Sequence, residues 1–113
     1  MPVINEFFVT YPQVETFGAN VDNLPLNSSY LSLKPTAGGL EVTGLQSPLE
    51  GRQAARMIIK NESAFNVTLK ANSASSAAEN QFKFIADVTL LPNQYAILTK
   101  VDEGFFLHSV FQA

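Results

Sequence analysis

Short runs of alternating apolar and polar residues, separated by turn-forming residues, cover the chain from residue 30 onward. The cleanest run is residues 65–69, in which three apolar residues alternate with Asn66 and Thr68. Alternation with a period of two is typical of a half-buried β-strand. The pattern predicts strands at 30–33, 40–43, 54–60, 65–69, 82–84, 87–91, 95–99 and 105–111.

The spacing of these runs favours an all-β fold. Turns recur roughly every 8–12 residues, which is the spacing of a sandwich, a jelly roll or a small barrel. The longest helical signal is a single turn over 77–79, which Ser75 or Ser76 could cap. We therefore expect a jelly-roll-like antiparallel β-sandwich and exclude a parallel α/β architecture.

The first 27 residues differ from the rest of the chain. They hold Pro2, Pro12 and Pro25, which argue against a regular element, together with four aromatic residues, which argue against a free tail. An extended arm that packs its aromatic rings on a protein surface fits both features. We expect an N-terminal arm over 1–27 and a sandwich body over 28–113, and the arm could pack on its own body or on a neighbour.

The last predicted strand is apolar on both faces. Simple alternation places Phe105, Leu107 and Phe111 on one face, and Phe106, His108 and Val110 on the other. Such a strand is central in its sheet or is covered by a partner. The aromatic residues of the arm and of this strand are the predicted partner interface: Phe7, Phe8, Tyr11, Phe17, Phe105, Phe106 and Phe111.

Composition supports a protein that meets neighbours. Only 15% of the 113 residues are charged, against about 25% in a typical soluble domain. The net charge is −3 and the Lys and Arg residues are scattered, so we expect neither a nucleic-acid nor a membrane partner. Because cysteine is absent, disulfides and thiolate metal sites are excluded. Met1–Glu6 lacks the features of a signal peptide, so we expect synthesis in a cytoplasm.

No pattern in the sequence frames a catalytic site. His108 is the only histidine, and it lies in an apolar strand without a recognisable hydrolase or metal motif around it. The adjacent acids Asp102 and Glu103 precede Gly104 in a predicted turn, where acidic side chains usually make local hydrogen bonds. The sequence therefore predicts no catalytic residues, no cofactor, no metal site and no enzymatic activity.

A run across the second half of the chain resembles virion proteins of tailed phages. The matching features are Ile58–Ser63, Val67–Lys70, a small-residue loop that ends in Asn80-Gln81-Phe82, and the strands at 88–92 and 95–98. The resemblance covers about 40–55 residues, and it departs where Phe105-Phe106 stands in place of a Trp-containing strand. It implies a β-sandwich module of capsid decoration (cement) proteins, head fibres or tail fibres, and it supplies no catalytic residues.

From this resemblance and the absence of a repetitive shaft we expect a capsid decoration or cement protein. It would be made in the host cytoplasm, lie on the virion surface as a homo-oligomer (a trimer or a dimer), and bind and stabilise the major capsid protein. Other functions stay open at this point. They are a tail, baseplate or head-fibre component that binds host surface glycans, a stand-alone carbohydrate-binding module, and an enzyme.

Overall fold

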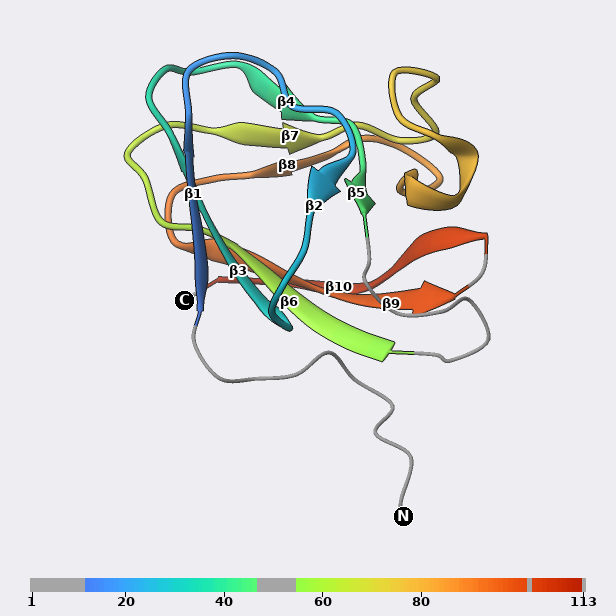
Figure 1. Cartoon of the computed structure of the whole chain (residues 1–113). Helices are drawn as coiled ribbons and strands as arrows, with labels where there is room; N and C mark the ends of the chain where they lie inside the picture. The colour runs from blue at the N-terminus through green and yellow to red at the C-terminus, as the bar shows by residue number, and fades with distance from the viewer. Residues whose placement is uncertain (1–11, 47–54, 102, 113) are drawn as a thin grey trace.

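The computed structural model describes residues 12–46, 55–101 and 103–112, and its strands form three sheets (Figure 1). The largest sheet has five strands in the order β1-β3-β6-β9-β10. A three-stranded sheet, β4-β7-β8, forms a second layer, and β2 and β5 make a third, two-stranded sheet. The strands are β1 (Gln13–Phe17), β2 (Leu24–Pro25), β3 (Tyr30–Pro35), β4 (Leu40–Val42), β5 (Leu45–Gln46), β6 (Ala55–Asn61), β7 (Val67–Leu69), β8 (Val88–Leu90), β9 (Gln94–Val101) and β10 (Gly104–Gln112). The expected all-β class is confirmed.

In the N-terminal half the chain winds so that strands from successive turns pair in parallel. β3 lies parallel to β1, β6 lies parallel to β3, and between these strands the chain visits the other two sheets. In those two sheets, β5 pairs with β2 and β7 pairs with β4, again in parallel. The antiparallel pairing expected of a jelly roll is therefore wrong for this half. Alternation fixes which face of a strand is buried, but it does not fix the direction of the neighbouring strand.

The C-terminal half closes both main sheets with antiparallel strands. β8 pairs with β7, β9 pairs with β6, and β10 pairs with β9. Between β7 and β8 the chain forms one 3-10 turn, η1 (Ala78–Asn80), close to the predicted helical turn. Its N-cap is Ala77, so neither Ser75 nor Ser76 supplies the predicted cap.

Part of the expected arm over residues 1–27 belongs to the folded sheets of its own chain. β1 is a strand of the five-stranded sheet, and β2 pairs with β5. Leu24 and Leu26 belong to the buried core. The chain can form these elements despite Pro12 and Pro25, because a strand at a sheet edge tolerates a residue without an N–H group. Residues 1–11 of the expected arm lie outside the described residues.

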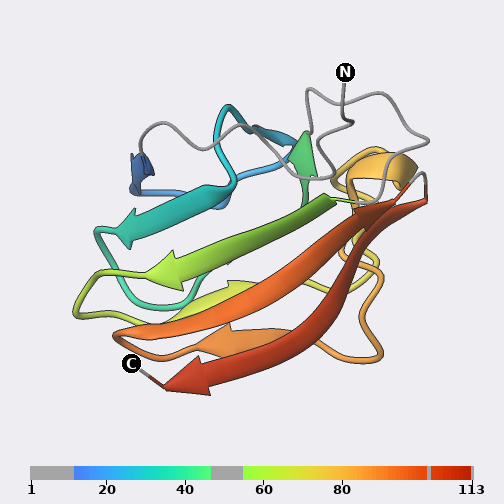
Figure 2. The same cartoon turned by 90° about the horizontal axis from the view of Figure 1, so that it is seen from below.

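The core lies between the two main sheets and is built by strand alternation. On β9, Ala96, Leu98 and Lys100 are buried, whereas the residues between them are half-buried. The buried hydrophobic cluster comprises Leu24, Leu26, Leu31, Leu33, Val42, Leu45, Met57, Ile59, Val67, Leu69, Phe82, Phe84, Leu90, Ala96, Leu98 and Phe105. Figure 2 shows β10 at one edge of the large sheet, of which β1 forms the other edge.

Candidate assembly interface

The described predicted interface residues do not share one environment in the structure. Phe7, Phe8 and Tyr11 lie outside the described residues, and so does the side chain of Phe111. Phe17 is half-buried at the end of β1 and packs against the core of its own chain.

Phe105, another predicted interface residue, is buried in the core of its own chain. Its side chain is 0% exposed, its ring centroid lies 6.1 Å from that of Phe82, and the Lys100 ammonium lies 5.1 Å from the ring centroid. The backbone of Phe105 is also enclosed, because its N–H donates to the Gln81 carbonyl and its carbonyl accepts from the Lys83 N–H. The first residues of β10 therefore lie between β9 and the segment that follows η1.

Farther along β10 a β-bulge changes which residues share a face. Leu107 pairs with Leu98, but Ser109 pairs with Ile97, so the bulge absorbs one extra residue. Val110 consequently pairs with Ala96 and lies on the same face as Leu107, contrary to the simple alternation expected from the sequence. Leu98 and Ala96 are fully buried, so this is the inner face of the sheet.

The inner face of β10 is nevertheless exposed beyond Phe105. Leu107 is 37% exposed and Val110 is 40% exposed, although their partners on β9 are buried. The physical reason is the mismatch between the layers, because three strands cannot cover a sheet of five. One side of the sandwich, between β10 and the segment that leads into β8, therefore stays open.

A groove of about 470 Å³ marks this opening. It is lined by residues 83–88 on one side and by Phe106 and Leu107 on the other. Ile85 stands fully in solvent at its rim. Of the seven large hydrophobic residues that the described part of the chain exposes, four lie on β10 or at this rim. We call these four residues, Ile85, Phe106, Leu107 and Val110, the apolar seam.

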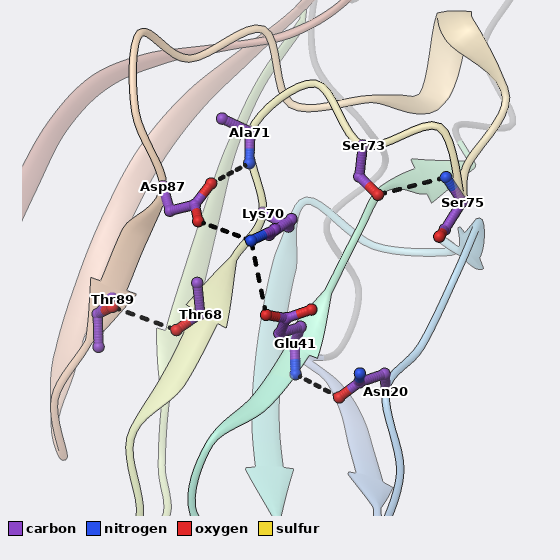
Figure 3. A network of polar contacts seen from close by, with 9 residues as sticks. All are labelled: Asn20, Glu41, Thr68, Lys70, Ala71, Ser73, Ser75, Asp87 and Thr89. Atoms are coloured by element: carbon purple, nitrogen blue, oxygen red, sulfur yellow. Dashed lines mark hydrogen bonds and ion pairs between the residues drawn. The ribbon is translucent and has the colours of Figure 1, made fainter.

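A second surface, on the three-stranded sheet, is polar and internally paired (Figure 3). The Lys70 ammonium lies 3.1 Å from the Asp87 carboxylate and 3.8 Å from the Glu41 carboxylate. The Asp87 carboxylate also accepts a hydrogen bond of 2.8 Å from the Ala71 N–H. Further hydrogen bonds of this surface join Thr68 to Thr89, Asn20 to Glu41 and Ser73 to Ser75.

The charges of this polar surface are held in their ionised forms. The hydrogen bond from the Ala71 N–H, followed by that from Lys70, lowers the pKa of Asp87. The Asp87 carboxylate in turn raises the pKa of Lys70. On β3 and after β6, the hydrogen bond from the Ser32 hydroxyl lowers the pKa of Glu62. A general acid or base needs a pKa shifted toward neutrality, so these groups do not suit that role.

Buried polar groups in the described residues hold the fold together rather than a ligand. Asn23 adopts a positive φ of 48°, its N–H donates to the Ser76 hydroxyl, and its side-chain oxygen accepts from the Asn80 amide. The Ser76 hydroxyl also bonds the Thr43 hydroxyl at 2.7 Å. A Cβ on Gly44 would lie only 2.5 Å from the Asn80 carbonyl oxygen, so this segment packs directly on backbone. Sequence reasoning missed this network because its members lie more than 30 residues apart.

Every buried side-chain nitrogen or oxygen in the described part of the chain has a hydrogen-bond partner. No group of three or more His, Cys, Asp or Glu side chains within that part could hold a metal ion. The side chain of His108 and all of Asp102 lie outside it, whereas Glu103 is exposed. The apolar seam is therefore the strongest candidate for a functional surface on the described structure.

No helix of the described residues is long and apolar enough to cross a membrane. Comparisons with protein-family models, curated proteins and solved structures find no match to this chain.

Proposed function

We propose that this protein is a structural subunit that attaches to a larger protein assembly. The observation that carries the proposal is the apolar seam, which gathers exposed hydrophobic side chains at one edge of the sandwich. An exposed apolar surface with polar surroundings marks a site of protein interaction. The buried polar side chains of the described structure are paired within the chain.

The resemblance of residues 58–98 to tailed-phage virion proteins suggests which assembly this is. In its specific form, the proposal is a capsid decoration or cement protein that binds the major capsid protein on the virion surface. Repeated strand pairing and a satisfied core suit a protein that must withstand mechanical and thermal stress as part of a shell.

The free energies of apolar burial and of association indicate how strongly such a protein would bind. Fully burying one large apolar side chain contributes about 1.5–3 kcal/mol, so the partly exposed seam residues supply about 5 kcal/mol together. Association costs about 4–15 kcal/mol of lost translational and rotational freedom. One seam against a flat surface therefore binds weakly. Attachment becomes stable when many copies engage a symmetric lattice at once.

Binding to purified shells tests the proposal. Expanded capsids that lack this protein are incubated with it, sedimented, and analysed for bound copies and for the temperature at which they release DNA. We expect a fixed number of copies per shell and a higher release temperature. Shells that bind no protein and gain no heat resistance would contradict the proposal.

The N-terminal residues give a sharper version of this test. We expect Phe7, Phe8 and Tyr11 to contact a neighbouring subunit of the shell. Deleting residues 1–11 leaves β1 intact, because that strand begins at Gln13. The truncated protein should keep its thermal unfolding temperature and lose shell binding. Loss of both properties together would show that the segment serves the chain's own fold.

A further inference from the structure

We infer that the apolar seam is the contact between two copies of this chain, related by a two-fold axis. In this dimer the two β10 strands pair antiparallel, with the axis near Ser109. The five-stranded sheets then join into one continuous sheet. The inference rests on the proposed function only in treating the chain as an assembly protein; in the dimer the seam is occupied by the second copy, so attachment to a shell falls to the N-terminal residues proposed above.

The backbone of β10 supplies the first argument. Beyond Phe105, the described structure pairs this strand with β9 alone, so its other edge presents N–H and C=O groups. Soluble monomers usually guard such an edge with charged residues, proline or a very short strand. From residue 104 to the C-terminus the sequence contains no Asp, Glu, Lys, Arg or Pro, and β10 is nine residues long. The bulge after Leu107 is the only protective feature, and it leaves Ser109–Gln112 regular.

The side chains around the seam supply the second argument. Ile85 lies across the groove from Leu107, near the beginning of β10. Antiparallel pairing about Ser109 brings the far end of one β10 beside the beginning of the other. Ile85 of each copy then lies close to Val110 of the other copy. Side chains of the two seams then lie beside one another across the joined edge, and the fully exposed Ile85 gains an apolar partner.

Charge supplies the third argument and favours a second copy over a charged partner. The two ionisable residues that line the groove, Lys83 and Asp87, have opposite charges. The seam is therefore neutral, although the chain as a whole carries a charge of −3. Two identical seams can approach each other without net repulsion at the contact, whereas a strongly charged partner would find no complementary charge there.

A two-fold contact also gains more binding free energy than the contact of one seam with a flat surface. It removes apolar side chains of both seams from water and adds backbone hydrogen bonds between Ser109–Gln112 of each copy and Phe106–Ser109 of the other. Because each β10 edge is used by the other copy, the contact closes on itself and leaves no β10 edge to extend into a fibre.

Sedimentation velocity without any shell protein tests the inference on three full-length proteins. They are the wild type, Ile85→Lys in the seam, and Val14→Lys as the matched control on β1, the opposite edge of the same sheet. Both substituted side chains are exposed, Ile85 fully and Val14 by 53%, so both variants should fold. Circular dichroism and thermal unfolding verify the fold.

We expect the wild type to be a dimer at about 10–100 μM, the range in which weak specific contacts assemble. Ile85→Lys should raise the dimer dissociation constant at least tenfold, and Val14→Lys should leave it unchanged. A wild type that stays monomeric, a trimer, or equal effects of the two substitutions would overturn the inference. A dimer that binds no shell would contradict the proposed function alone. A monomer that binds shells would contradict only the inferred dimer.

Discussion

The two edges of the five-stranded sheet expose hydrophobic side chains in different settings. β1 is five residues long, follows Pro12 and carries Glu15 in its middle. β10 is nine residues long and carries no Asp, Glu, Lys or Arg. Val14 on β1 and Val110 on β10 are both exposed. Exposure of a single apolar residue therefore does not identify an interface, whereas the length and charge of the whole edge do.

The β1 edge is also held by its own chain. The buried Gln13 amide donates to the Pro25 carbonyl at 2.7 Å, and its side-chain oxygen accepts from the Asn27 N–H at 2.8 Å. These bonds fix residues 25–27 close to the beginning of β1. On β10, the comparable enclosure ends at Phe105, which is held by Gln81 and Lys83.

The largest expected effect comes from the enclosed beginning of β10. Phe105→Ala should lower the free energy of unfolding by about 3–5 kcal/mol, because it removes a fully buried ring that packs near Phe82. The neighbouring Phe106→Ala, which changes a ring that is 41% exposed, should lower it by less than about 1.5 kcal/mol. Urea unfolding of both variants measures the difference. Equal losses would mean that Phe105 does not belong to the core.

An intermediate effect is expected at the β1 edge. Gln13→Ala leaves the Pro25 carbonyl and the Asn27 N–H without their partner, which should lower the free energy of unfolding by about 1–3 kcal/mol. Gln46→Ala on β5 is the control, because Gln46 is exposed and its loss should change stability by less than about 0.5 kcal/mol. Thermal unfolding compares the two, and a Gln13→Ala protein as stable as the control would show that this edge is not fixed by the side chain.

The smallest effect is expected on the polar surface of the second sheet. Because the folded-state pKa of Asp87 is lowered, its stabilising contribution is complete at neutral pH and is lost as the pH falls below about 4. Asp87→Asn should remove this part of the acid dependence of unfolding. Glu79→Gln, which changes an exposed side chain on η1, should retain it. Unfolding curves between about pH 2 and 7 test this, and an unchanged acid dependence in Asp87→Asn would contradict the assigned ion pair.

The pKa of Lys70 is raised, so its contribution has the opposite pH dependence. It is complete at neutral pH and is lost as the pH rises above about 10.4. Asp87→Asn should remove the contribution of Asp87 and reduce that of Lys70, because Asp87 is the first cause of the shift at Lys70 and Glu41 is a further cause.

Sequence patterns predicted the individual strands better than their partners. The alternating run at 65–69 contains β7, and the runs at 87–91 and 95–99 contain β8 and most of β9. The predicted strand at 82–84 is not formed. Within it, Phe82 makes isolated β-bridges to Ala71 and to Phe105. Proline and turn residues in the first 27 positions concealed β1 and β2, whose strand character depends on pairing with residues far along the chain.

The candidate interface was predictable only in part. The apolar final strand led us to expect a partner, and Phe106 is exposed on that strand. The bulge after Leu107, which places Val110 on the inner face, has no signal in the pattern of residue types. The seam itself arises from the unequal widths of two sheets, a property that no single segment encodes. Ile85, its most exposed residue, lies between the predicted strands 82–84 and 87–91, so neither prediction included it.

Hydrogen exchange of the wild-type protein at two concentrations tests the unequal roles of the two edges most directly. Exchange is followed in peptides that cover β1 and β10, in a concentrated sample and after dilution below the dimer dissociation constant. We predict that amides of Ser109–Gln112 exchange more slowly in the concentrated sample, while those of Gln13–Phe17 exchange at the same rate in both. Equal exchange in β10 at both concentrations, or protection that appears in β1 instead, would contradict the account.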